Sequence, residues 1–348
     1  MEKIKIMARK KKKNAVNGKS VLSIVIIVIV VVFGYLYKDQ IIDFASDIIG
    51  YNNINLSGKL AVHFIDIGQG DSILIQNPEN EFILIDTGEK DQYEKLTGYL
   101  DYYKITKFKY VIFTHPHSDH IGSADKIVKN YDIENIIMSN ATNNTKTFER
   151  LITEIEKKNL EIIPAEPGDI YKFGDAEFII LAPNSEEYKS LNNYSVVIKL
   201  TYGNTKFLFT GDMEKESENE VISYCKNNNI NLSVDVLKVA HHGSSTSSQT
   251  NFIKTVNPEY AVIMCGTDNS YNHPNLKVVD RIESNGSEIL RTDLEGDIII
   301  VSDGQSVSVA QKGRGTSGNY MPENKSDKNK NKNNEYETEQ NEDFIENN

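Results

Sequence analysis

The sequence predicts an α/β protein in which two stacked mixed sheets carry helices on their outer faces. Three observations predict this class. Short runs rich in β-branched residues, punctuated by Gly, Asn and Pro, occur throughout residues 59–312. These runs fall into two β-rich halves, and each half also contains segments typical of helices. Because a sheet must bury at least one face, two such halves are expected to stack their sheets and pack the helices outside.

Strands dominate the first half of this region. A helix is predicted over residues 93–103, and another begins over residues 119–129. The run before the second helix is apolar and β-branched, which is typical of a buried strand. The predicted strands lie in "KLAVHFIDIG" (59–68), "DSILIQN" (71–77), "EFILIDTG" (81–88) and "YVIFTH" (110–115).

The second half repeats the same style. Three strand-like runs precede an acidic helix predicted over residues 213–227, and further strands follow it. The predicted strands lie in "AEFIILAP" (176–183), "SVVIKLTYG" (195–203), "TKFLFTGD" (205–212), "VDVLKVAHHGS" (234–244), "AVIMCG" (261–266), "DIIIVSDG" (297–304) and "SVSVAQ" (306–311).

The N-terminus predicts a membrane anchor. Residues 1–19 are strongly basic, and residues 20–37 form the uncharged run "SVLSIVIIVIVVVFGYLY". A helix of that length spans about 27 Å, enough for the hydrocarbon core of a bilayer. The preceding positive charge predicts a cytoplasmic N-terminus and an extracytoplasmic remainder. A cleaved signal peptide, which would make the protein secreted, is the alternative interpretation.

The rest of the chain divides into three parts. Residues 38–58 are expected to be a juxtamembrane connector, and residues 59–312 a single compact globular domain. Residues 313–348 are Asn, Lys, Glu and Ser with almost no apolar side chains. Such a segment cannot bury enough surface to offset its ordering entropy, so a disordered polar tail is predicted.

The composition argues against two classes of function. The formal net charge is −12, but residues 1–20 carry +7 and residues 313–348 carry −3, which leaves −16 for residues 21–312. A body this acidic lacks the broad basic surface of a non-specific DNA-binding protein, although a metal centre can reverse the field locally. Cys225 and Cys265 stand in apolar surroundings and predict buried small side chains rather than a disulfide or a cysteine-rich zinc site.

The stretch "VIFTHPHSDHIGS" (111–123) uses three of the seven histidines in the chain. His115 and His117 alternate along an extended segment and can therefore address one ion. Asp119 and His120 follow at the turn into a helix and can address a second ion. Imidazole and carboxylate groups suit zinc or manganese, so the H-x-H-x-D-H pattern predicts a metal site at a strand end.

Further ligand-type residues stand at other strand ends. Asp212 ends a strand and can bridge two ions, and the adjacent His241 and His242 follow another strand. Two metals roughly 3.5–4 Å apart can activate water and clamp the oxygens of a displacement at phosphorus. The further candidates of this kind are Asp66, Asp86 and His273.

These motifs, in this order, resemble the metallo-β-lactamase fold hydrolases. More narrowly, residues 59–309 are similar to the hydrolase domain of ComEC/Rec2 competence proteins, and this chain resembles a stand-alone, single-anchor relative. The resemblance implies an αββα sandwich with a dinuclear site at one edge of the two sheets. The stretches that carry it are "FIDIGQGDSILI", "ILIDTG", "THPHSDHIGS", "NNYSVVIKL", "FLFTGD", "LKVAHHGSSTS", "YNHPN" and "RTDLEGDIII".

The chain departs from the broader superfamily in two ways. Many members have a third histidine for the first metal, but none occurs between His120 and Asp212; "NNYS" (192–195) stands there. The ComEC-like branch shares this substitution, which favours harder ions such as manganese. Full competence channels also surround this domain with many membrane helices, whereas one is predicted here, so a separate DNA-uptake channel protein is an open partner.

The expected roles are these. His115 and His117 bind the first ion, Asp119 and His120 the second, and one of His241 and His242 completes the second site. The other histidine of that pair contacts substrate phosphate, and the sequence does not say which. Asp119 and His273 are the catalytic candidates; His273 either assists the leaving group or is a plain loop residue. The residues expected to support ligands, shape the site floor or contact phosphate are Asp66, Gln69, Asp71, Ser72, Asp86, Ser195 and Ser244.

The leading hypothesis is a membrane-anchored, extracytoplasmic metallohydrolase that cleaves phosphodiester bonds with two divalent ions, zinc or manganese. The ComEC resemblance favours a DNase. A phosphorylcholine or teichoic-acid esterase acting on wall polymers is an alternative within the same fold, and a β-lactamase is disfavoured by the missing histidine. A non-catalytic, membrane-tethered binding protein with a degenerate site is the alternative from another class. The oligomeric state cannot be predicted.

Overall fold

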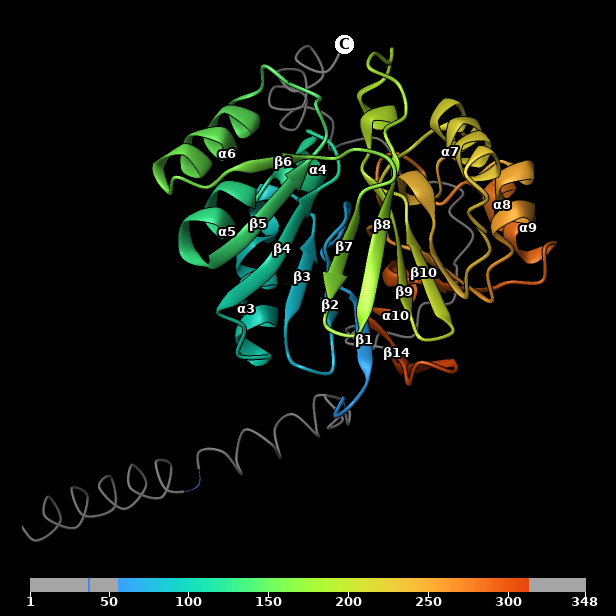
Figure 1. The fold of residues 1–348 in the computed structure, drawn as a ribbon, viewed down its shortest axis with the longest axis horizontal. Coiled ribbons are helices and arrows are strands. Elements are labelled where there is room, and N and C mark those ends of the chain that lie inside the picture. Colours follow the sequence, from blue (N-terminus) through green and yellow to red (C-terminus); the bar gives the residue numbers. More distant parts are fainter. Residues whose placement is uncertain (1–36, 38–55, 313–348) are drawn as a thin grey trace, which may run out of the picture. The chain divides into compact units, whose positions relative to one another are not determined.

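The computed structural model describes Tyr37 and residues 56–312, and two mixed sheets lie face to face between two layers of helices (Figure 1). This arrangement confirms the predicted α/β class. The predictions for residues 1–36, 38–55 and 313–348, which include the anchor and the tail, lie outside the described residues. Within the described part, no helix has both the length and the apolar character needed to cross a bilayer.

The first sheet contains eight of the described strands: β1 (Leu60–Phe64), β2 (Ile73–Gln76), β3 (Phe82–Ile85), β4 (Lys107–Phe113), β5 (Asp132–Met138), β6 (Ile162–Pro164), β14 (Ile298–Ser302) and β15 (Val307–Lys312). Their spatial order is β15-β14-β1-β2-β3-β4-β5-β6. Neighbours from β15 to β3 pair antiparallel, whereas β3 to β6 run parallel. The parallel part directs several strand ends to one edge.

The second sheet contains seven of the described strands: β7 (Ile170–Phe173), β8 (Ala176–Ala182), β9 (Val197–Tyr202), β10 (Thr205–Phe209), β11 (Val236–Lys238), β12 (Tyr260–Ile263) and β13 (Glu288–Arg291). Their order is β13-β12-β11-β10-β9-β8-β7. β10 to β13 run parallel, and β7 to β10 pair antiparallel. This sheet therefore has its own parallel edge.

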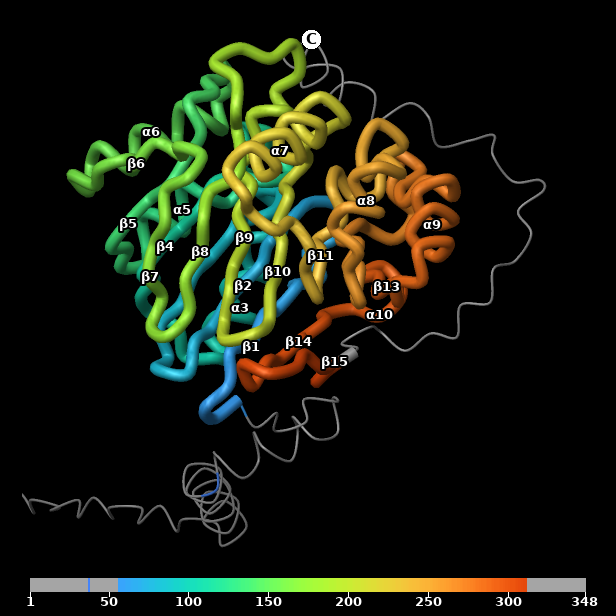
Figure 2. Tube along the Cα trace, turned by 45° about the vertical axis from the view of Figure 1, so that its right-hand side comes forward, coloured from blue at the N-terminus to red at the C-terminus, as the bar shows by residue number. Residues whose placement is uncertain are grey.

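Helices cover both outer faces. Those on the first sheet are α3 (Tyr93–Tyr102), α4 (Ser118–Ile121), α5 (Ala124–Asn130) and α6 (Lys146–Lys157); those on the second are α7 (Lys215–Asn227), α8 (Thr250–Val256) and α9 (Leu276–Glu283). α10 (Thr292–Glu295) lies between β13 and β14 in the chain. Figure 2 shows α7, α8 and α9 together beside the second sheet.

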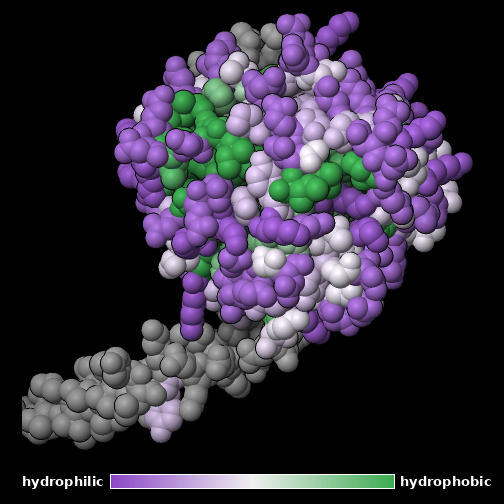
Figure 3. All heavy atoms as spheres, in the orientation of Figure 1, coloured by the Kyte–Doolittle hydropathy of each residue, from purple (hydrophilic) through white to green (hydrophobic). Residues whose placement is uncertain are grey.

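Among the described residues the hydrophobic core has three large clusters, one between the sheets and one under each helical layer, and a small fourth cluster of Ala61, Ile299 and Val301. The period-2 geometry of strands produces this division. In β1, Val62 and Phe64 face the central core, while Ala61 faces outward. Fully burying a side chain such as Phe64 contributes about 1.5–3 kcal/mol, so the central layer holds the two sheets together. Figure 3 shows that hydrophilic residues cover most of the face in that view, with separate hydrophobic areas between them.

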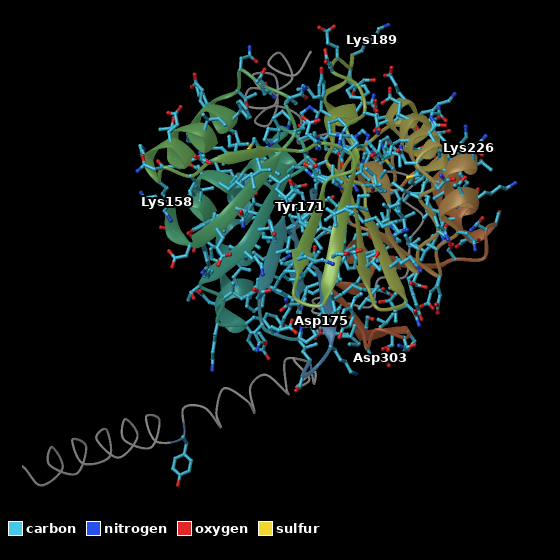
Figure 4. All side chains as sticks on the ribbon, in the orientation of Figure 1. Lys158, Tyr171, Asp175, Lys189, Lys226 and Asp303 are labelled. Carbon is cyan, nitrogen blue, oxygen red and sulfur yellow. The ribbon has the colours of Figure 1, made fainter. Side chains whose placement is uncertain are left out.

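The predicted ligand residues gather at one edge of the sandwich. They follow the carboxyl ends of β3 and β4 in the first sheet and of β10 and β11 in the second. α4 begins at this edge (Figure 1), whereas Asp175 and Asp303, which lie in turns between antiparallel strands, are at the opposite end (Figure 4). Two parallel edges that meet place residues from both halves of the chain next to each other.

The prediction of one continuous helix over residues 119–129 was wrong. The segment forms two helices, α4 and α5, separated by Gly122 and Ser123. Ser123 leaves the helical region with φ −102° and ψ 3°. A Cβ at Gly122 would lie 2.4 Å from the backbone nitrogen of Lys90, so another segment packs directly against the break. The prediction for Cys225 and Cys265 is confirmed, because both are buried free thiols.

Candidate metal centre

The segment after β4 carries two pairs of ligand-type side chains, one before α4 and one within it. His115 is 2% exposed, and its Nε2 lies 3.0 Å from Nδ1 of His117. His117 has extended φ/ψ of −88° and 152° and immediately precedes α4. The chain then turns into α4, so Asp119 and His120 project from a helical turn instead of continuing the alternation. The two pairs remain neighbours, because the ring centres of His115 and His120 are 4.2 Å apart.

Four side chains converge on one point at this edge. Single ligand atoms of Asp119, His120, Asp212 and His242 all lie within 4.8 Å of one another. Asp212 Oδ2 is 3.3 Å from both His120 Nε2 and His242 Nε2, and His242 Nε2 is 3.2 Å from Asp119 Oδ2. These four residues are called the acidic-imidazole cluster below.

The Asp86 carboxylate holds the His120 ring through Nδ1, the nitrogen that faces away from the cluster. Asp86 Oδ2 lies 2.7 Å from His120 Nδ1, and the same carboxylate accepts hydrogen bonds from the backbone N–H of Thr114 at 2.8 Å and its hydroxyl at 2.6 Å. Asp86 is fully buried with φ 57°. A carboxylate next to Nδ1 keeps a proton on that nitrogen, so Nε2 is the nitrogen left to bind an ion in the cluster.

The backbone carbonyl of Met264 does the same for His242. His242 Nδ1 lies 2.9 Å from that oxygen, which can only accept, so Nδ1 carries the proton. Asp71 lies 3.4 Å from the same nitrogen, and its other oxygen pairs with Lys238 at 2.7 Å. Lys238 and Asp71 are both buried. The ring is thereby held with Nε2 directed at Asp119 and Asp212.

The charges of the cluster favour a bound cation. Burial would lower the pKa of His120, but the carboxylates of Asp212 and Asp119 outweigh it and hold that pKa well above its ordinary value. Burial would raise the pKa of Asp212, but His242 and His120 outweigh it and hold that pKa well below its ordinary value. Within the described residues, His120 Nε2 and Asp212 Oδ1 are buried without a hydrogen-bond partner. The cluster thus offers two imidazole nitrogens and two carboxylates, and two of its atoms lack a hydrogen-bond partner. This donor set fits a divalent metal ion.

Asp212 is positioned by a tight turn. Its backbone N–H donates to Ser195 Oγ at 3.0 Å, and Gly211 before it has φ 49°. A Cβ at Gly211 would lie 2.9 Å from that same Oγ, so only glycine fits. Ser195 is buried and also lies 3.4 Å from His115 Nδ1. Its hydroxyl therefore contacts two residues of the site, and its predicted contact with phosphate stays a prediction.

His241 and His273 lie at the rim of this cluster. His241 has φ 51°, and its Nε2 is 3.8 Å from Asp212 Oδ2, farther than His242. Its side chain is 21% exposed, and its Nδ1 lies 3.2 Å from Thr246 Oγ1. The His273 ring centre is 5.6 Å from that of His241. Burial, with smaller effects from the neighbouring histidines, lowers the pKa of His273 to about 4, so its imidazole is neutral at pH 7.

Other predicted site residues take different positions. Asp66 pairs with Lys95 at 3.0 Å and accepts the N–H of Gly68, which makes it part of a turn. Gln69 accepts the N–H of Gly266 at 3.2 Å, and Ser72 donates to the carbonyl of Asp86. Ser244 is buried with its hydroxyl 3.1 Å from that of Thr246. The structure thus brings the HxHxDH residues, Asp86, Asp212 and the histidine pair together and leaves Asp66 outside.

Two polar residues near the cluster were missed or undervalued. Lys238 had no predicted role, although a lysine inside the apolar strand "VDVLKVA" is unusual enough to have signalled a buried partner. Asn192 was quoted only as part of "NNYS". Its Nδ2 is 3.5 Å from the His241 ring, and its Oδ1 is buried without a partner among the described residues. It lies where a third histidine was expected.

Comparison with known proteins agrees with this geometry. Residues 65–267, more than half of the chain, match the sequence model of the Metallo-beta-lactamase superfamily. The chain belongs to the metallo-β-lactamase superfamily. Its matched range contains the HxHxDH segment, Asp86, Asp212 and the histidine pair. It is therefore a hydrolase of this superfamily with a candidate dinuclear metal site.

Relatives within the metallo-β-lactamase superfamily include competence proteins, which confirms the resemblance inferred from the motifs. ComE operon protein 3 of Bacillus subtilis (strain 168) is 32% identical over 260 residues, covering 70% of this chain and 33% of the relative. Competence protein ComA of Neisseria gonorrhoeae is 29% identical over 239 residues, covering 68% and 32%. The chain spans about a third of the length of these relatives. The solved metallo-β-lactamase fold protein YhfI from Bacillus subtilis aligns with 70% of this chain and 100% of its own, at 14% identity and a TM-score of 0.49.

Proposed function

We propose that this chain is a dinuclear metal-dependent phosphodiesterase that cleaves DNA in the manner of a ComEC-type hydrolase domain. The observation that carries the proposal is the acidic-imidazole cluster with its unpartnered His120 Nε2 and Asp212 Oδ1. The neighbouring His115–His117 pair offers two more ring nitrogens 3.0 Å apart. A competence-protein relationship favours nucleic acid as the phosphodiester.

The donors divide between two ions, zinc or manganese. Asp119, His120, Asp212 and His242 would hold one ion, whereas His115 and His117 would hold the other, with Asp212 as the bridge. This assigns His242 as the ligand of the histidine pair and leaves His241 for substrate. When bound, two such ions lower the pKa of a water molecule and offset the negative charge that builds up on phosphate oxygens.

Residues of the protein itself orient the histidine ligands and donate hydrogen bonds to the substrate. Asp86 and the Met264 carbonyl keep His120 and His242 in the tautomer that presents Nε2. His241, whose side chain is 21% exposed, would donate a hydrogen bond to a phosphate oxygen. His273 beside it would donate, as a neutral imidazole, to the departing oxygen. Burial of the cluster excludes bulk water and strengthens each of these interactions.

The proposed location follows from the N-terminal sequence alone. Residues 20–37 would anchor the chain in the cell membrane, with the basic residues 1–19 cytoplasmic and the hydrolase domain extracytoplasmic. A hydrolase held there would meet DNA or wall polymers outside the cell. A separate channel protein would be needed to carry a cleaved strand inward, since one predicted span cannot form a channel.

The test is hydrolysis by the purified full chain loaded with manganese or zinc. Substrates are single-stranded DNA, duplex DNA, poly(glycerol phosphate) and bis-p-nitrophenyl phosphate. We expect metal-dependent DNA cleavage that Asp212→Ala lowers by at least about 10³-fold and that Asp175→Ala, at the opposite end of the sheets, leaves unchanged. Cleavage of the wall-type polymer alone would move the function to a teichoic-acid esterase. Absence of turnover on every substrate, with metal bound, would reject the proposed phosphodiesterase activity.

A further inference from the structure

A groove between α8 and α9 carries cationic side chains on an otherwise acidic chain. The groove has a volume of about 490 Å³. Its charged lining consists of Lys254 from α8 with Lys277, Arg281 and Asp280 from α9, three cations against one carboxylate. Residues 21–312 as a whole carry −16. A locally positive groove on such a chain indicates a binding surface for an anion.

Hydrogen bonds tie α9 to the segment that follows the histidine pair. α9 starts two residues after Pro274, and the N–H of Asn275 donates to the carbonyl of Gly243, directly after the histidine pair, at 2.9 Å. Arg281 Nη1 donates to the carbonyls of Ser247, at 3.2 Å, and Ser248. α8 and α9 lie side by side in Figures 1 and 2. One end of the groove is thus fixed against the segment that follows His242.

An exposed aromatic ring stacks on His273, in the loop that precedes α9. Tyr271 is 64% exposed, and its ring stacks on that of His273 with centres 5.7 Å apart and planes 21° from parallel. Asn269 fixes this loop: it accepts the N–H of His273 at 2.9 Å and donates to the carbonyls of Gly266 and His273. The tyrosine is therefore presented on a preorganised loop. Exposed aromatic rings beside a cationic groove are the recurring surface of single-strand binding proteins.

From these observations we propose that the path from Tyr271 along the α8–α9 groove binds a single-stranded nucleic acid as it enters or leaves the metal centre. One base stacks on Tyr271, and the adjoining phosphates lie against Lys277, Lys254 and Arg281. The inference rests on the proposed phosphodiesterase function and narrows its substrate to strands with unpaired bases. A duplex hides its base faces, and a glycerol-phosphate polymer has none, so neither would use Tyr271.

The experiment measures binding of fluorescein-labelled oligothymidine to the full chain by anisotropy in EDTA, where metal-dependent cleavage is prevented. Tyr271→Ala should weaken binding by at least about fivefold, whereas Tyr271→Phe should keep it. Lys254→Glu with Lys277→Glu should weaken binding by about tenfold or more and reduce the salt slope by about 0.7 for each phosphate that is no longer neutralised. The matched control is Lys226→Glu, an exposed lysine on α7 (Figure 4), which should leave binding unchanged.

The outcomes separate this inference from the function on which it rests. Equal affinity in the unaltered chain, Tyr271→Ala and the double lysine variant would overturn the path, whatever the chain cleaves. Equal use of Tyr271 by poly(glycerol phosphate) would overturn the assignment of a base-bearing strand. If the metal-loaded chain does not turn over bis-p-nitrophenyl phosphate but still binds oligothymidine through Tyr271, the single-strand binding path is supported and the proposed phosphodiesterase activity is rejected.

Discussion

At the scale of single residues, the site depends on which nitrogen of each histidine faces inward. The HxHxDH spacing predicts that His120 is a ligand, but only the structure shows Asp86 on Nδ1 and therefore Nε2 toward the cluster. The sequence could not choose between His241 and His242. Both have left-handed backbone conformations, with φ of 51° and 53°, and such angles reverse the direction of adjacent side chains. That choice depends on backbone geometry that spacing does not reveal.

Asp86→Asn tests the control of the His120 tautomer. An amide NH₂ facing Nδ1 would force that nitrogen to accept, which moves the proton to Nε2 and removes the lone pair from the cluster. We expect metal affinity to fall about 10–100-fold, measured by chelator competition with manganese and zinc. Asp175→Asn is the control and should bind metal normally. Unchanged affinity in Asp86→Asn would show that His120 does not bind through Nε2.

The raised pKa of Asp297 should make the stability of the protein depend on pH. Burial raises its pKa to about 6, while its Oδ1 accepts the N–H of Asp66 at 2.8 Å. Between pH 4 and pH 6 the folded chain binds this proton and the unfolded chain does not, so the contribution of Asp297 falls as pH rises. Asp297→Asn keeps the acceptor and should be more stable above pH 6 by about 2–3 kcal/mol, as measured by urea unfolding. A constant difference between the two proteins from pH 4 to pH 8 would contradict this account.

At the scale of elements, the β-branched runs predicted most strands that carry the site, including β1 to β4 and β8 to β12. Pattern alone also predicted the helix over residues 93–103, which is α3 within one residue. It failed at the boundary between α4 and α5, because the break depends on the approach of Lys90 to Gly122 from a segment 32 positions earlier. Periodicity describes local preference, whereas this break is a tertiary contact.

Two glycines in helical backbone provide a matched test of that contact. At Gly122 a Cβ would lie 2.4 to 2.6 Å from backbone atoms, whereas at Gly98 on the exposed side of α3 nothing lies within 4 Å. Gly122→Ala should lower the free energy of unfolding by about 1–3 kcal/mol, the usual range for overpacking. Gly98→Ala should raise it by up to about 1 kcal/mol through helix propensity. Urea unfolding of both variants checks this, and equal effects would refute the close packing at α4.

At the scale of the whole molecule, the site exists because the two face-to-face sheets bring the carboxyl ends of their parallel strands to the same edge of the sandwich. Asp86 and His120 come from the first half, and Asp212 and His242 from the second. Sequence spacing cannot show that these halves converge; the resemblance to a known family supplied that expectation. The buried ion pair of Lys238 with Asp71 also joins the two sheets, since Asp71 precedes β2 and Lys238 ends β11.

Lys238→Met tests how far this pair supports the sandwich. Removing the ammonium leaves Asp71 buried without its cation, and we expect a loss of about 3–5 kcal/mol in the free energy of unfolding. Adding Asp71→Asn to that variant should recover much of the loss, because no uncompensated charge then remains. A double-mutant cycle by urea unfolding measures the coupling. Additive losses from the two changes would contradict a direct role for the pair.

The most direct test of the two-ion site is the position of manganese in crystals of the full chain. Anomalous scattering at the manganese absorption edge gives that position. We expect one peak bound by Asp119, His120, Asp212 and His242, and a second, roughly 3.5–4 Å away, bound by His115 and His117. Asp212→Ala should remove or weaken both. If crystals of catalytically active protein show no peak in the acidic-imidazole cluster, or show manganese bound elsewhere on the chain, the two-ion site is contradicted.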